Sequence, residues 1–170
     1  SSPLPLSFLK NQDLDIALTV ERLRAFSTTL THVTLPVSQK NGTLSVPIKA
    51  AFPGGGQADG NFQTSLSGNG STADTSLRVQ ARNMNMMNFS RDRGQQTLIG
   101  GNGTFHADLR SVQKNWEDWK RTLNGSLSLH IADGVIITRS PSRTDPAVQK
   151  ESRTEFKTMS MNLALSKGIA

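Results

Sequence analysis

Apolar and polar residues alternate along most of this chain. The alternation is clearest between residues 14 and 20, where every second residue is a large aliphatic one. A period of two places successive side chains on opposite faces of a β-strand, so each such stretch predicts a strand with one apolar face. Short turns join the first five stretches, which favours an antiparallel meander. The predicted strands span residues 14–26, 30–39, 43–52, 57–67, 75–83, 103–109, 125–132, 135–138 and 156–165.

Glycine, asparagine and proline mark the ends and irregularities of these strands. Asn41 and Gly42 supply the positive φ angles of a tight hairpin turn. Asp133 and Gly134 predict a second break, at which one strand stops and the next begins. Pro36 lies inside a predicted strand. Because proline has no backbone N–H, that strand is expected at a sheet edge or with a local bend.

Two segments lack the strand pattern and favour short helices. Residues 84–89 are rich in methionine and predict a short helix or an irregular cap. Within residues 115–123, the side chains Trp116, Trp119 and Leu123 follow one another at the i, i+3 and i+7 positions of a helix. This spacing places all three on one helical face. We predict that this helix is a lid packed against the sheet.

The strand faces decide the fold class. Each predicted strand has one apolar face, and two short helices are too small to cover a sheet of eight or nine strands. Two solutions remain, a closed sandwich of two sheets or one sheet curled into a trough. Both stay open on the strand faces alone, and the second is the one that the resemblance described below implies: a mainly β fold in which an antiparallel, strongly curved meander sheet forms an open half-pipe or groove, with one or two short helices packed on or capping its apolar face. Residues 1–170 form a single β-rich domain in this interpretation, with a flexible loop at 140–153.

A large apolar concavity usually marks a binding surface, so the inner strand positions are the candidate site. The residues predicted to line the groove are Leu14, Ile16, Leu18, Val20, Leu44, Val46, Ile48, Leu77 and Val79.

Composition and charge narrow the range of partners. The formal net charge is +6, but the basic residues are scattered, without a run of five or more. Such a surface suits simple solvation, anionic lipid headgroups or nucleic acid. Tyrosine is absent and tryptophan occurs twice, which leaves few stacking platforms for bases, so we expect no nucleic-acid partner. No apolar stretch approaches the roughly 18–20 residues that span a bilayer.

Groups that carry catalysis are scarce. The chain has no cysteine, which excludes thiolate metal sites and cysteine nucleophiles. His32, His106 and His130 fall on different predicted strands without carboxylates at ligand spacing. No nucleophile elbow, phosphate-binding loop or zinc-helix motif is present. We therefore expect no enzymatic activity, no cofactor, and no catalytic, metal-binding or cofactor-binding residues.

The order of these elements resembles a known family. The pattern of strand, Asn-Gly turn, triple glycine, short helix, strand, tryptophan-containing helix and Asp-Gly-Val is similar to the C-terminal periplasmic region of the AsmA-like proteins of Gram-negative bacteria. Those proteins are in turn related to the chorein-like bridge lipid-transfer proteins. The resemblance rests on the segments 14–23, 40–44, 54–62, 76–81, 83–89, 101–109, 116–125, 133–135 and 154–169.

The resemblance implies a function as well as a fold. It implies a fragment of a longer periplasmic protein, attached to the inner membrane by an N-terminal helix outside this chain and involved in outer-membrane biogenesis and phospholipid homeostasis. It also implies an apolar groove for phospholipid acyl chains. The alternative is a structural or assembly scaffold that binds an envelope protein without carrying lipid. A third class, a sandwich that binds glycan or nucleic acid, would need clustered aromatic residues or a basic stripe. The oligomeric state stays open.

Overall fold

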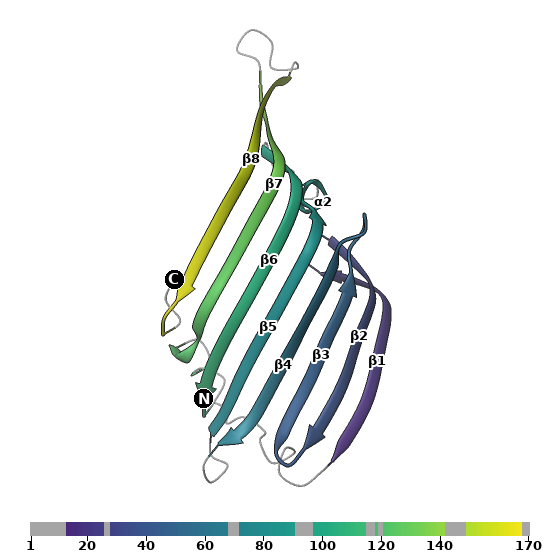
Figure 1. The fold of residues 1–170 in the computed structure, drawn as a ribbon, viewed down its shortest axis with the longest axis vertical. Coiled ribbons are helices and arrows are strands. Elements are labelled where there is room, and N and C mark those ends of the chain that lie inside the picture. The colour runs from purple at the N-terminus through teal and green to yellow at the C-terminus, as the bar shows by residue number, and fades with distance from the viewer. Residues whose placement is uncertain are drawn as a thin grey trace.

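Eight antiparallel strands lie side by side in the order in which they occur in the sequence. The structure, a computed structural model, describes residues 13–25, 28–67, 72–90, 97–114, 118, 121–141 and 149–167 (Figure 1). One short helix, α2 (Met86–Ser90), follows the fifth strand and packs on the sixth. The strands are β1 (Leu14–Ala25), β2 (Thr28–Lys40), β3 (Thr43–Ala51), β4 (Gln57–Ser67), β5 (Thr72–Asn85), β6 (Thr97–Gln113), β7 (Asn124–Pro141) and β8 (Gln149–Leu165).

The sheet is open, as the sequence predicts. β1 and β8 are its two edges, and they do not pair with each other. The mainly β, antiparallel meander is therefore confirmed, and the closed sandwich is excluded. The face is also curved: Leu30 from β2 and Phe105 from β6 line one cavity of about 400 Å³. In a flat sheet these strands would stand roughly 19 Å apart, since neighbouring strands are about 4.8 Å apart.

Three β-bulges bend individual strands. A bulge places two residues of one strand opposite a single residue of its neighbour and increases the local twist. The pairing register shifts between β2 and β3, between β5 and β6, and between β6 and β7. At each shift one residue of the bulged strand has a positive φ, namely His32 (51°), Asn83 (54°) and Asp133 (48°). Asparagine and aspartate tolerate this conformation better than most residues.

The bulge at Asp133 corrects one prediction. The Asp133–Gly134 pair does not end a strand, because β7 continues without interruption from Asn124 to Pro141. The left-handed conformation that the two residues favour is used inside the strand, where Gly134 pairs with Phe156. A β-carbon on Gly134 would overlap the Phe156 ring, so the glycine makes room for the aromatic ring of the neighbouring strand.

The flexible loop predicted at 140–153 is wrong at both of its ends. Ser140 and Pro141 belong to β7, and residues 149–153 belong to β8, with Ser140 opposite Lys150. Opposite charges support this extension, because Arg139 Nε donates to Glu151 Oε2 at 3.2 Å. At residues 140–141 and 149–153, the polar composition therefore did not indicate a loop. Residues 142–148 lie outside the described part of the chain.

Two prolines face each other inside the sheet. The register between β2 and β3 places Pro36 opposite Pro47, between the paired residues Thr34–Lys49 on one side and Ser38–Ser45 on the other. Pro36 is thus not on an edge strand, since β2 lies between β1 and β3. Both residues lack a backbone N–H, so the sheet loses both donors at a single pairing position.

One face of the sheet is polar, and its ion pairs cross between strands. Arg110 of β6 donates from Nε to Asp74 Oδ1 of β5 at 3.0 Å, and its second guanidinium nitrogen bonds to Asp74 Oδ2. A similar pair joins Arg78 and Asp108 at 3.2 Å. The hydrogen bonds from Arg110 hold the pKa of the Asp74 carboxyl below its ordinary value, against a smaller opposing effect of burial.

We expect this pair to make stability fall more steeply in acid. The folded pKa of Asp74 is lowered, whereas in the unfolded chain the carboxyl titrates at about 3.9. The stabilising contribution is therefore complete above that pH and is lost as the pH falls through the folded value. Urea unfolding midpoints between pH 3 and 6 should fall less steeply for Asp74→Asn than for the wild type. Arg110→Gln should flatten the profile equally, and a profile unchanged in both variants would contradict the assignment.

Candidate functional site

The apolar face carries a continuous band of side chains that crosses all eight strands. Paired residues of antiparallel strands point to the same face, so the register shows which side chains share it. Val46 lies opposite Phe62, and Phe62 lies opposite Leu77. We call the whole band the apolar stripe. Its three rows are Val20, Val33, Ala50, Ala58, Ala81, Phe105, Leu129 and Met161; Leu18, Leu35, Ile48, Gly60, Val79, Ala107, Leu127 and Leu163; and Ile16, Val37, Val46, Phe62, Leu77, Leu109, Gly125 and Leu165.

The dimensions of the stripe follow from strand geometry. Seven strand spacings of about 4.8 Å give a length of roughly 34 Å from β1 to β8. Along the strands, from Ala58 to Thr64 of β4, six residues at about 3.3 Å each give a width of roughly 20 Å. The stripe therefore extends from one edge of the sheet to the other.

All nine residues predicted to line a groove lie on this face. Seven of them belong to the three rows, namely Ile16, Leu18, Val20, Val46, Ile48, Leu77 and Val79. Leu14 and Leu44 stand one row further along β1 and β3, where Leu14 pairs with Gln39 and Gln39 with Leu44. Residues in the middle strands are half-buried, but the β1 residues are exposed, and Leu18 keeps 49% of its surface. At the opposite edge Met161 is 63% exposed. Edge residues lack a neighbouring strand, which explains why they are the most open to solvent.

A row of buried polar side chains borders the stripe on one side. Ser111 of β6 is 1% exposed, and its hydroxyl lies 2.7 Å from the hydroxyl of Thr122. Gln113 Nε2 donates to Thr75 Oγ1 at 3.2 Å, and the Thr75 hydroxyl lies 2.9 Å from that of Thr64. These hydrogen bonds offset the cost of burying polar groups. The polar row consists of Gln39, Thr64, Thr75, Ser111 and Gln113.

The predicted lid helix is described only in part. Trp116 and Trp119 lie outside the described residues. Asp118, Arg121 and Thr122 have helical conformation, and Thr122 Oγ1 donates to the backbone oxygen of Asp118 at 2.9 Å. Leu123 is half-buried and lines a small cavity of about 60 Å³ together with Phe62, Leu77 and Leu109. In the described part of this segment, Leu123 covers the apolar face.

Helix α2 borders the stripe on the other side. The Asn85 side chain caps the helix, because its Oδ1 accepts the backbone N–H of Met87 at 3.1 Å. Phe89 of α2 packs against Phe52, which follows β3, with ring centroids 5.6 Å apart and planes at 62°. Asn88 Nδ2 also donates to the Pro53 oxygen at 3.4 Å. The methionine-rich segment predicted as a short helix or cap is therefore a helix that is fastened to the loop after β3.

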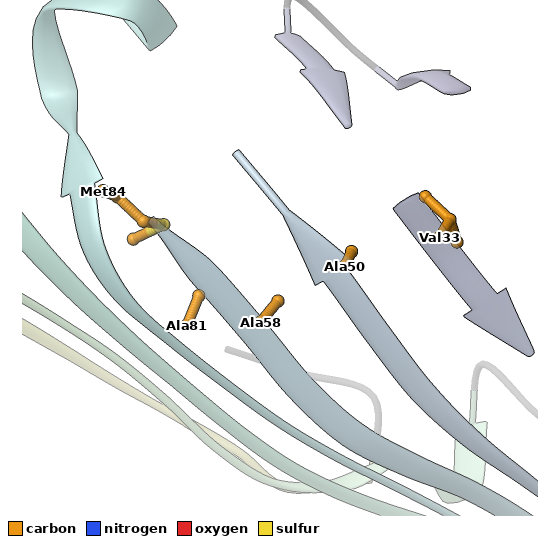
Figure 2. Packing of buried hydrophobic residues seen from close by; sticks show 5 residues of the cluster. All are labelled: Val33, Ala50, Ala58, Ala81 and Met84. Atoms are coloured by element: carbon orange, nitrogen blue, oxygen red, sulfur yellow. The ribbon is translucent and has the colours of Figure 1, made fainter. Parts of the chain in front are cut away.

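Between α2 and the sheet lies an apolar cavity of about 400 Å³. Its floor is formed by small side chains of neighbouring strands, and Figure 2 shows Ala50, Ala58 and Ala81 pointing to the same side of the sheet, with Met84 beside them. The sequence pattern did not predict this cavity, because alanines in alternating positions give no sign of what stands above them. Its lining is Leu30, Ile48, Ala50, Phe52, Ala58, Val79, Ala81, Met84, Met86, Phe89 and Phe105.

Phe89→Ala is expected to loosen α2 and to lower the free energy of unfolding by about 1–2 kcal/mol, because the aromatic contact and part of the apolar burial are lost. The Phe89 ring is half-buried, so the loss should be smaller than for a fully buried phenylalanine. Urea unfolding measures the change. Asn88→Ala serves as a control on the same helix and should cost clearly less, and an equal loss in both variants would contradict the role of the ring pair.

The described residues contain no cluster of three or more potential metal ligands. Two of the three histidines lie on the polar face, where His106 contacts Gln80 and His130 Nδ1 lies 2.9 Å from Ser160 Oγ. Among the described helices, none has the length and apolar character needed to cross a membrane.

No curated protein and no solved structure matches the chain. A family model does match, and its description is AsmA family. This family is associated with the bacterial envelope, and membership suggests a role in outer-membrane biogenesis. The match covers residues 2–170 and thus almost the whole length, so the resemblance inferred from the order of the sequence elements is confirmed: the chain belongs to the AsmA family.

Proposed function

We propose that this chain is a non-enzymatic, lipid-binding segment of a periplasmic protein that is attached to the inner membrane and acts in outer-membrane biogenesis and phospholipid homeostasis. The apolar stripe carries this proposal. It crosses all eight strands, and its exposed ends lie at the two open edges of the sheet. Acyl chains of phospholipids are the occupants that we assign to it.

Acyl chains suit the stripe because it offers apolar contact without hydrogen-bonding groups. Removing apolar surface from water stabilises a complex by about 25 cal/mol per Å², and the exposed side chains at both edges supply such surface. The opposite, polar face with its ion pairs gives the sheet a second, hydrated side. Lipid headgroups would stay in water while the chains lie on the stripe. Exposed apolar surface of this extent is also uncommon in proteins that bind nothing there.

Lipid co-purification tests the proposal directly. The purified protein is incubated with phospholipid vesicles, separated from them by size-exclusion chromatography and analysed for bound lipid by mass spectrometry. We expect phospholipid to elute with the protein in a fixed molar ratio. A transfer assay between donor and acceptor vesicles then measures whether lipid moves. Protein that elutes without lipid at every vesicle concentration would overturn the proposal.

The open edges favour a second candidate, an assembly scaffold that binds an envelope protein. Exposed edge strands present unpaired backbone groups to which another strand can be added. β8 is charged between Glu151 and Lys157, which discourages such pairing, but it has no charge between Thr158 and Leu165. Capture of a defined envelope protein by the lipid-free chain, and its loss when Ser160 is replaced by proline, would support the scaffold.

A further inference from the structure

We propose that the cavity beneath α2 is a seat for the methyl end of a single acyl chain. This inference deepens the proposed function and rests on it, because it assigns one lipid tail to one place on the apolar face. The stripe would then hold lipids along its length, whereas the cavity would fix one chain by its end. The argument uses the lining, the volume and the position of the cavity.

The lining selects hydrocarbon. Every residue that lines the cavity has an apolar side chain, and they come from β2, β3, β4, β5, β6 and α2. A headgroup placed there would lose its hydrogen bonds to water without gaining others, which is costly. A methylene chain makes no hydrogen bonds to water that it could lose, and it gains close contacts with the apolar lining. Met84 and Met86 are unbranched and adapt to an irregular chain end.

The floor of the cavity is low because small residues of neighbouring strands lie opposite one another. Ala50 pairs with Ala58, and Ala58 pairs with Ala81, so three neighbouring strands present methyl groups at one level. Around this floor stand larger side chains, among them Phe52 and Phe89. The register shifts at His32 and Asn83 occur beside the floor and bend β2 and β5 there. The low floor of the cavity therefore results from the pairing register and the bulges of the sheet.

The volume fits one chain. The hollow has a volume of about 400 Å³, is open to solvent on one side and is lined by apolar side chains alone. An apolar cavity of about 150 Å³ accepts one benzene ring, so this volume corresponds to on the order of fifteen carbon atoms. Because the hollow is open on one side, this number is an upper bound: the hollow admits the end of one acyl chain and is too small for the two chains of a phospholipid. One tail would enter, and the other would lie on the stripe.

The width of the stripe agrees with this arrangement. About 20 Å separate the alanine floor from the polar row along β4. One leaflet of a bilayer, which one chain length spans, measures about 15 Å of hydrocarbon. A chain that starts in the cavity and lies along the strands therefore ends near the polar row, where hydroxyl and amide groups begin. The face thus has a defined end for the methyl group and a defined end for the polar group.

Cross-linking of the wild-type protein tests the seat. Two photoreactive fatty acids are compared, one with a diazirine at the methyl end and one with a diazirine next to the carboxyl group. Trypsin releases residues 83–91 as one peptide, because Arg82 and Arg91 flank it, and this peptide contains Met84, Met86 and Phe89. We expect the methyl-end probe to label this peptide and the carboxyl-end probe to label peptides elsewhere on the stripe.

A variant pair adds an independent readout. Ala81→Phe fills the cavity from its floor, whereas Gln80→Phe places the same ring one residue away on the opposite face. Labelling of residues 83–91 by the methyl-end probe should fall about tenfold or more in Ala81→Phe, because the ring takes the space of the chain end. It should be unchanged in Gln80→Phe, and phospholipid should still co-purify with both.

The outcomes separate the two proposals. Lipid that binds but labels the peptide 83–91 equally with both probes, or not at all, would overturn the seat and leave the proposed function intact. The same holds if Ala81→Phe folds and is labelled as strongly as the wild type. If no lipid binds to the wild-type protein, the proposed function fails and the seat fails with it. If Ala81→Phe does not fold, the comparison of the two probes on the wild type decides alone.

Discussion

Leu18→Asp and Met161→Asp are each expected to lower phospholipid co-purification about tenfold or more while the protein stays folded. Both side chains are open to solvent, with 49% and 63% of their surface exposed, so a charge at either position costs the folded state little. With lipid bound, the new carboxylate would lie against hydrocarbon. Burial of an unpaired charge costs several kcal/mol, and each 1.4 kcal/mol corresponds to a tenfold change in affinity.

Neighbouring positions on the other face supply matched controls. Thr19→Asp and Asn162→Asp introduce the same charge one residue away, where alternation directs the side chain to the polar face. Net charge is then equal in each pair, so attraction to anionic vesicles cannot explain a difference. Bound lipid per protein is measured by mass spectrometry, and folding by circular dichroism. Equal loss of lipid within each pair would show that the apolar stripe is not the binding face.

Gly125→Ala is expected to lower the free energy of unfolding by about 3 kcal/mol, from backbone strain and steric overlap together. Gly125 has a φ of 141°, a conformation that residues with a β-carbon rarely adopt. A β-carbon there would also overlap the backbone oxygen of Asp108 on β6. Because that obstacle is backbone in a paired strand, it has little freedom to move. The first residues of β7 would have to separate from β6.

Gly55→Ala separates the two causes. Gly55 also has a positive φ, 93°, but nothing stands within 4 Å of a β-carbon built on it. This control should therefore show the strain alone, about 1 kcal/mol. Urea unfolding of both variants gives the comparison. If Gly125→Ala proved no more destabilising than Gly55→Ala, the close approach of β6 and β7 at this position would be wrong.

The sequence was sufficient for the one-sided strands and for their order. Alternation with a period of two depends only on neighbouring residues, so Leu14, Ile16 and Leu18 predicted a face before any partner was known. Short turns then predicted the meander, since they force successive strands to pair. The lack of residues to cover that face left a closed sandwich or a curved open sheet, and the family resemblance favoured the open sheet. These features could be predicted because they depend on residues that are close together in the sequence.

The features that failed depend on pairing. Asp133 and Gly134 have the residue types of a turn, but the same left-handed preference serves a bulge when the strands on both sides continue. Thr64 and Thr75 alternate with apolar residues and gave no sign that they would meet in a buried polar row. The cavity beneath α2 required three alanines from separate strands to fall into register. Only the pairing register, which sequence alone does not supply, joins such positions.

The facing prolines weaken the pairing between β2 and β3, so these two strands should separate more easily than other neighbouring strands. Pro36 and Pro47 leave one pairing position between β2 and β3 without donors, while β1 stays paired with β2 along its length. The β1–β2 hairpin is therefore joined to the rest of the sheet by a weakened ladder. We expect the β1–β2 hairpin to move relative to β3 more easily than the other strands move relative to one another. The width of the apolar face could then adjust to the size of a bound acyl chain. If acyl chains lie on the apolar stripe as proposed, such a movable edge would let the sheet accept chains that differ in shape.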